Sequence, residues 1–279
     1  MSGYDAQTSG GTASSDTATV SHTCTGTNRA LYSVVYAYDS GVTPAVPTTL
    51  LYNSVAMTEV DTVLYAGNER FTLFRLENPS SGANNNVLTQ PASYDENFIM
   101  NISSDDTLQT ASLHTALKET PAGTVLSLTP TTVNGELVIS FATVYDFALA
   151  VTGGETERTS ASQNTQNFSS STEVAGGATT NMSWSVASSG NTAAHYAVGV
   201  KAFVASDTLE QEGFRWRNDN GSETTATWEE LQDVNMTAPI LVTKRIRILV
   251  NGSGDPDPAA VQIEYKVDGE SDTTYKVVH

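Results

Sequence analysis

The sequence predicts an all-β fold built from two antiparallel β-sandwich domains, and three observations carry this prediction. Short runs rich in β-branched and aromatic residues alternate with turns rich in Ser, Thr, Gly and Asn along almost the whole chain of 279 residues. No stretch of helical length shows the apolar period of an amphipathic helix. Charged residues make up only 16 % of the chain, so hydroxyl and amide groups supply most of its polarity.

The N-terminal segment has an unusual composition. Residues 1–17 are rich in Ser, Gly, Thr and Asp, which by itself indicates a flexible arm. We expect this arm to be ordered by its own domain or by a neighbouring subunit. Strands are then expected at 18–25 and 29–38, joined by a Gly-Thr-Asn turn. Both faces of 29–38 are largely apolar, which predicts a central strand covered on both sides.

The remainder of the first domain shows the same pattern of short strands. They are expected at 49–52, 56–60, 70–77, 98–103, 125–129, 136–145, 182–187 and 196–204. In the strand at 182–187, alternation turns three residues inward and two towards water: Met182, Trp184 and Val186 against Ser183 and Ser185. Asn134-Gly135 is the strongest hairpin signal. The stretch 155–180 has few large apolar residues and predicts a long hairpin or an exposed loop, a candidate contact surface.

A domain boundary is expected near 205–213, where the composition becomes acidic and polar. We therefore divide the chain into a jelly-roll-like sandwich at 1–205, which includes the ordered arm, and a small immunoglobulin-like sandwich at 206–279. Strands of the second domain are expected at 214–217, 224–228, 244–251, 261–267 and 274–278. In 244–251 the alternation places one set of residues inside and one outside: Ile246, Ile248 and Val250 against Arg245 and Arg247.

The charge balance excludes two classes of partner. The chain has 31 acidic and 13 basic residues, a formal net charge of -18. Nucleic acid and anionic membranes repel such a surface, so we expect neither as a partner. Residues 1–5 lack the start of a signal peptide, and no run reaches the roughly 20 apolar residues of a membrane helix. We expect synthesis in the cytoplasm, where the protein either stays or from which it leaves by lysis or as part of a particle.

The single cysteine, Cys24, has no partner for an intrachain disulfide, and we interpret it as a buried apolar thiol rather than a reactive or intermolecular one. His22 shares its strand face, which makes a metal pair geometrically possible. Two ligands do not complete a zinc site, so no metal site is predicted.

No catalytic constellation stands out, and we predict neither catalytic residues nor a cofactor. The four histidines, at 22, 114, 195 and 279, lack metal-ligand spacing, and no Gly-x-Ser-x-Gly elbow occurs. A Ser-His-acid triad from scattered positions stays open, and nothing singles out the two acids of a glycosidase.

Three further motifs have two interpretations each. The acidic turns at 255–257 and 268–272 offer oxygens to Ca²⁺, but their spacing is not that of an EF-hand, and solvated turns are favoured. Arg215-Trp216-Arg217 suggests either a carbohydrate or partner platform, or a core Trp216 flanked by solvent-facing arginines that pair with acids; the second is favoured. Trp228 is also expected in the core.

The segment Phe214-Arg-Trp-Arg-Asn-Asp-Asn-Gly, continued to Trp228 and followed by matching runs at 235–239, 244–250, 254–256 and 262–266, resembles a module common in structural proteins of tailed double-stranded DNA phages. The first domain is similar to another phage-associated sandwich, through Val20-Ser-His-Thr-Cys24, the Gly-Thr-Asn turn to Arg29-Ala-Leu31, and Tyr196-Ala-Val-Gly-Val200. The two resemblances cover nearly the whole chain. They bring no catalytic residues.

The resemblance implies a non-enzymatic virion component. We expect a decoration protein or head fibre on the capsid exterior that contacts the major capsid protein or other virion proteins. A homotrimer is expected by analogy with other sandwich-fold decoration proteins. The alternative is a tail or adsorption protein that binds host surface glycans, and a third class is a secreted glycan-active enzyme.

Overall fold

The computed structural model describes residues 1–121, 123–188, 192–203, 208–218, 220–222, 225–234, 236, 244–253, 264–265 and 276–277. These residues form strands and turns, with no helix among them, and every strand pair is antiparallel. The all-β prediction is confirmed. The chain divides into two compact units, Met1–Val204 and Ala205–His279, beside the boundary expected from composition. The described part of the chain contains no helix able to cross a membrane.

The strands of the first unit follow one another with short connections. They are β1 (Gly3–Cys24), β2 (Ala30–Tyr38), β3 (Thr49–Tyr52), β4 (Val55–Ala56), β5 (Thr58–Tyr65), β6 (Glu69–Glu77), β7 (Gly82–Asp105), β8 (Leu117–Glu119), β9 (Val125–Leu128), β10 (Leu137–Tyr145), β11 (Leu149–Val151), β12 (Thr156–Gln163), β13 (Gln166–Val174), β14 (Met182–Val186) and β15 (Ala193–Val200).

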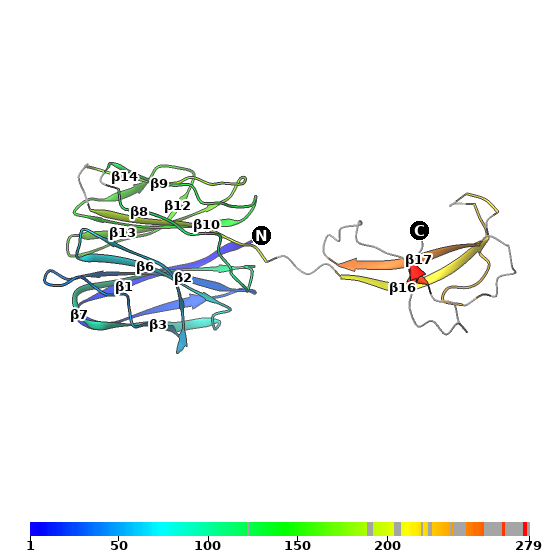
Figure 1. Ribbon diagram of the computed structural model, residues 1–279, viewed down its shortest axis with the longest axis horizontal. Helices are drawn as coiled ribbons and strands as arrows, with labels where there is room; N and C mark the ends of the chain where they lie inside the picture. Colours follow the sequence, from blue (N-terminus) through cyan, green and yellow to red (C-terminus); the bar gives the residue numbers. More distant parts are fainter. Residues whose placement is uncertain are drawn as a thin grey trace. The chain divides into compact units, whose positions relative to one another are not determined.

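These strands form three sheets. Sheet I has the order β4-β3-β7-β2-β6-β5, with β1 also paired to β7; sheet II has the order β12-β13-β10-β15-β8; and sheet III has the order β11-β14-β9. Figure 1 shows them stacked, with β9 and β14 of sheet III on one side of β10 and β13, and β2 and β6 on the other. Three sheets packed face to face bury more apolar surface than the two sheets of a single sandwich.

Sheet I folds back on itself. The first half of β1 pairs with the end of β7, from Gly3 opposite Asp105, and its second half pairs with the start of β7, up to Cys24 opposite Gly82. The register shifts between Ser15 and Thr17. Beyond this bend β7 exchanges β2 for β3 as its second neighbour. Figure 1 accordingly shows β3 on the side of β2 and β6 that faces away from sheet II.

Each interface between these layers has its own apolar core. One cluster joins sheet I to sheet II through Tyr36, Phe98 and Phe168, with Phe98 stacked on Phe168 at 4.0 Å between ring centroids. A second cluster fills the fold within sheet I and includes Cys24 and Leu88. Two more lie between sheets II and III. Strands β2, β10 and β15 are buried along almost their whole length, because they lie between two such cores.

Several sequence predictions are confirmed. The strand expected at 29–38 is central and covered on both faces. Cys24 is a buried free thiol. Met182, Trp184 and Val186 face inward. Ser183 does not face water as expected, because its hydroxyl bonds the Thr152 hydroxyl at 2.6 Å and its backbone N–H reaches a buried carboxylate.

Residues 1–17 are not an arm. They form most of β1, and Ser2 before it is buried. At position 11 of this strand a glycine is required for steric reasons. A Cβ there would collide with the backbone oxygen of Asn97 and the side chain of Gln163. Its backbone pairs with β7, so the segment is ordered by its own domain, which was one of the two expected alternatives.

The stretch 155–180 is a hairpin, as one of the two alternatives predicted, and not an exposed loop. Strands β12 and β13 pair within sheet II, and Phe168 is fully buried. The Asn134-Gly135 turn exists, with Gly135 at a φ of 85°. It is not a hairpin turn, however, because β9 before it belongs to sheet III and β10 after it belongs to sheet II.

The second unit contains two antiparallel pairs among its described residues. Strands β16 (Thr208–Asn218) and β17 (Lys244–Ser253) form a ribbon, and β18 (Glu264–Tyr265) pairs with β19 (Lys276–Val277). The expected inward position of Ile246 is wrong, since this side chain is 44 % exposed. Alternation determines which residues share a face of a ribbon, but it does not determine which face is covered. The side chain of Val250 and the acidic turns at 255–257 and 268–272 lie outside the described residues.

Candidate functional site: an acidic cavity between two sheets

Four polar side chains form a hydrogen-bonded network between sheets II and III, and three of them are connected like a catalytic triad. The Ser140 hydroxyl bonds His195 Nε2 at 2.8 Å, and His195 Nδ1 bonds Glu119 Oε1 at 3.0 Å. Trp184 Nε1 donates to the Ser140 oxygen at 2.8 Å. The first three groups are in the order of the Ser-His-acid arrangement that the sequence left open.

This network is sealed within the core. Ser140, His195 and Trp184 are fully buried, so a substrate carbonyl has no route to the hydroxyl. Burial lowers the pKa of His195, although the Glu119 carboxylate opposes this effect. The arrangement satisfies the hydrogen bonds of polar groups that the fold buries, and we interpret it as structural.

The His22 and Cys24 side chains lie on one buried face of β1, as the sequence indicated. His22 Nδ1 bonds the Thr8 hydroxyl at 2.9 Å, and the Tyr52 hydroxyl donates to the His22 carbonyl oxygen at 3.1 Å. Burial lowers the pKa of His22 to about 4 and raises that of the Cys24 thiol. Within the described ranges, no group of three or more His, Cys, Asp and Glu side chains is placed to hold a metal ion.

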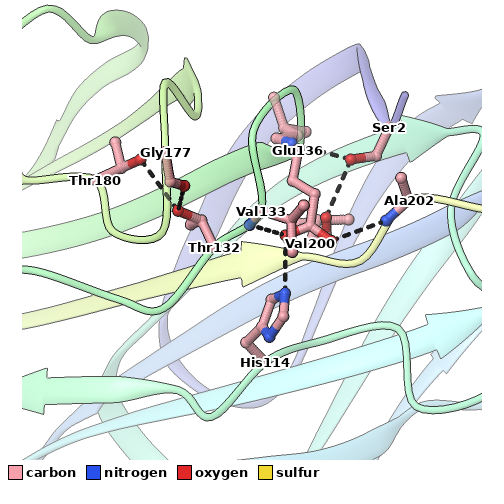
Figure 2. A network of polar contacts seen from close by, with 10 residues as sticks. Ser2, His114, Thr132, Val133, Glu136, Gly177, Thr180, Val200 and Ala202 are labelled. Atoms are coloured by element: carbon pink, nitrogen blue, oxygen red, sulfur yellow. Dashed lines mark hydrogen bonds and ion pairs between the residues drawn. The ribbon is translucent and has the colours of Figure 1, made fainter.

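A second polar network holds the two ends of the first unit together (Figure 2). The Ser2 hydroxyl donates to the Val200 carbonyl oxygen at 3.0 Å and accepts from the Leu137 backbone N–H at 2.9 Å. Glu136 accepts from His114 Nε2 at 2.8 Å and also from backbone N–H groups at Val133 and Ala202. Strand β1 thereby begins beside the end of β15, which explains why a polar N-terminus is ordered.

The most distinctive site is a cavity of about 90 Å³ at one end of the interface between sheets I and II. Its lining residues are Tyr36, Tyr38, Glu69, Glu96, Tyr145, Thr165 and Gln166. The register explains why these residues meet: Tyr38 lies directly opposite Glu69 on β6 and opposite Glu96 on β7. Residues opposite one another in a sheet point to the same face. In sheet II, Tyr145 and Gln166 form the pair that faces them.

The cavity contains oxygen atoms without hydrogen-bond partners. Glu69 and Glu96 are 5 % and 7 % exposed, and one carboxylate oxygen of each has no partner. The side-chain oxygen of Gln166 also has none, while Gln166 Nε2 donates to the Thr143 hydroxyl at 2.6 Å. The other oxygen of Glu96 accepts from Asn164 Nδ2.

The electrostatics follow from this burial. Burial raises the pKa of Glu69 to about 7, with a smaller increase from the Glu96 charge and an opposing effect of the Tyr65 hydroxyl. Burial also raises the pKa of Glu96, and the hydrogen bond from Asn164 opposes it. The lining residues carry no positive charge. Such perturbed carboxyl groups in a cavity mark a candidate binding site.

Sequence reasoning missed this site. Glu69 and Glu96 lie on strands that are not neighbours in the sheet, and they meet only because β2 lies between β6 and β7. The available signal was an acid at an inward position of an alternating strand, and Glu69 is in register with the inward Phe71 and Leu73. Without the strand order, nothing related it to Glu96.

The Arg-Trp-Arg motif of the second unit differs from the favoured interpretation of it, and the platform interpretation stays a prediction. Arg215 and Arg217 were expected to face solvent and pair with acids. Instead they stack on Trp228, with their guanidinium carbons 4.4 and 4.7 Å from the centre of its ring. Trp228 is 36 % exposed, so its expected core position is wrong, and Trp216 is half-buried. The arginines use the indole as a stacking surface because β16 bridges to Trp228 at Arg217.

The arginines of the β16–β17 ribbon form cross-strand pairs. Arg215 lies opposite Arg247, and Arg217 lies opposite Arg245. All four therefore share one face of the ribbon.

Comparison with known proteins returns no relative. No family model matches the chain, and neither a curated protein nor a solved structure is similar to it.

Proposed function

We propose that this protein is a non-enzymatic structural protein of a tailed-phage virion, a decoration protein or head fibre on the capsid exterior. The proposal begins from the resemblance of 214–228 and of the strand at 20–24 to phage structural modules. One structural observation carries it further, namely the unequal distribution of basic residues between the two units.

The first unit is strongly acidic. It contains six basic and 17 acidic residues. Among its basic side chains, Arg75 pairs with Glu77 at 3.3 Å and Lys118 pairs with Asp61 at 2.6 Å. A layered, acidic unit of this kind suits dense display, because surfaces of like charge resist aggregation.

The second unit contains the other seven basic residues, together with 14 acidic ones, within 75 positions. Four of them are the arginines paired across β16 and β17. Like charges directly opposite one another destabilise a ribbon. Arg217 is buried, whereas Arg215 is partly exposed and Arg247 is exposed. An acidic surface on the major capsid protein or on another virion protein would complement these two charges, so we assign attachment to Arg215 and Arg247.

The same proposal includes a homotrimer, by analogy with other sandwich-fold decoration proteins. Sedimentation equilibrium of the purified protein tests it directly. A mass three times that of the monomer is expected, and a monomer at all concentrations would exclude the trimer.

A second candidate function is host-glycan binding by a tail or adsorption protein. The observation that favours it is a hollow of about 390 Å³ on sheet I, lined mainly by amide and hydroxyl side chains: Asn53, Ser54, Ala83, Asn84, Asn85 and Val87. Amide groups are suited to hydrogen-bond sugar hydroxyls.

Immunogold electron microscopy of phage particles, with antibodies against the first unit, tests the location. Label on the head is expected, label on the tail would favour the second candidate, and unlabelled particles would exclude both. Capsid co-sedimentation tests the attachment surface. The double variant Arg215→Gln/Arg247→Gln is expected to lose at least ten-fold in capsid affinity, while the control Arg75→Gln keeps it. Equal loss in both variants would contradict the assignment.

A further inference from the structure

The cavity between sheets I and II contains two carboxylates with no positive side chain in its lining. Glu69 and Glu96 are each more than nine-tenths buried. An ionised carboxylate removed from water is strongly destabilised unless a counter-charge or several hydrogen bonds compensate for it. Here one oxygen of each carboxylate has no hydrogen-bond partner. The carboxylates of Glu69 and Glu96 therefore have no positive side chain in the cavity to balance their charge.

The unpartnered atoms form a suitable ligand set. They are Glu69 Oε2, Glu96 Oε2 and Gln166 Oε1, and all three belong to residues that line the same cavity. The Gln166 amide nitrogen is occupied by its bond to Thr143, which leaves the amide oxygen for the cavity. Tyr36, Tyr38 and Thr165, whose side chains end in hydroxyl groups, line the same cavity. Hard divalent cations prefer ligand sets made only of oxygen.

The coordination geometry favours calcium over magnesium. A volume of about 90 Å³ holds an ion with one or two waters, since one water occupies roughly 30 Å³ in the liquid. Two carboxylates balance two positive charges. The ligands come from strands of two separate sheets, β6 and β7 on one side and β13 on the other. Calcium accepts such irregular geometry with six to eight oxygens, whereas magnesium requires a near-ideal octahedron.

We propose that this cavity binds one calcium ion through Glu69, Glu96 and Gln166, with water completing the coordination shell. The ion links β6 and β7 of sheet I to β13 of sheet II. Binding to the folded state alone raises the thermal midpoint of unfolding in proportion to the logarithm of the calcium concentration. This proposal does not depend on the proposed virion role.

The test uses the full-length protein after treatment with a chelator. Titration calorimetry with CaCl₂ is expected to give one bound ion per chain, and saturating calcium is expected to raise the thermal midpoint by about 5 °C. Terbium gives a second, local readout, because three tyrosines line the cavity and can sensitise its emission. Calcium should displace bound terbium and remove this emission.

Neutral variants of the same shape identify the ligands. Glu69→Gln and Glu96→Gln are each expected to weaken calcium binding at least ten-fold, and the double variant should abolish it. Glu155→Gln is the matched control, since Glu155 is a buried carboxylate held internally by Ser171 and the Ser183 backbone. Circular dichroism checks that each variant is folded.

Two results would overturn the proposal. One is the absence of a calcium-dependent heat and of a midpoint shift in the wild-type protein, which would mean that protonation alone neutralises the carboxyl pair. The other is unchanged calcium binding in a folded double variant, which would place the ion elsewhere on the acidic surface.

Discussion

Protonation of His22 is expected to destabilise the protein below neutral pH. This side chain is 1 % exposed on β1, and its Nε2 has no hydrogen-bond partner. Burial lowers its pKa to about 4, although the Asp5 charge opposes the effect. In the unfolded chain the pKa of histidine is about 6.5. The folded state therefore keeps His22 neutral over a range of pH in which the unfolded state binds a proton.

The magnitude follows from this difference. A separation of about 2.5 pH units corresponds to about 3 kcal/mol in the free energy of unfolding. The contribution of the neutral, buried imidazole is fully present above pH 6.5, because neither state is protonated there. It is lost progressively as the pH falls to about 4, because protons bind the unfolded state first.

Urea unfolding of the wild type and of His22→Asn between pH 7.5 and 4 measures the effect. Asparagine keeps an acceptor near Thr8 but does not titrate. The advantage of the wild type over the variant should shrink by about 3 kcal/mol across this range. His195, whose pKa burial also lowers, and Glu69, whose raised pKa acts in the opposite direction, are present in both proteins and cancel. A constant difference between the two proteins, or an NMR titration of His22 near pH 6.5, would refute the reasoning.

Three further predictions concern the first unit. Deletion of residues 1–17 should abolish cooperative unfolding in circular dichroism, because it removes 12 of the 19 residue pairs between β1 and β7; a folded truncated protein would restore the arm interpretation. Trp184→Phe should cost about 2 kcal/mol in urea unfolding, since it removes both buried volume and the donor to Ser140, and an unchanged midpoint would contradict this. Cys24 should react with a thiol reagent only after unfolding, because the native thiol is buried and its pKa is raised; rapid labelling of the native protein would show that it is accessible.

Local alternation in the sequence was sufficient to determine the fold class and the orientation of many side chains. The apolar residues on both faces of β2 required cover on both sides, and this strand is fully buried except at its end. Trp184 faces a core because it alternates with serines. These properties depend on neighbours within a few residues, and the two-residue period of a strand fixes them whatever the strand order.

Only the tertiary structure decided the properties that depend on distant partners. The polar β1 is a strand because it pairs with β7, whose residues lie some 60 to 100 positions further along the chain, and it has little apolar pattern of its own to reveal this. Alternation could not predict that Ile246 is exposed, because it does not determine which face of a ribbon is covered. Glu69 and Glu96 share a cavity because β2 lies between their strands and Tyr38 is in register with both. Strand order and register are set by the packing of whole sheets, and so the acidic cavity emerges only when all of its strands are in place.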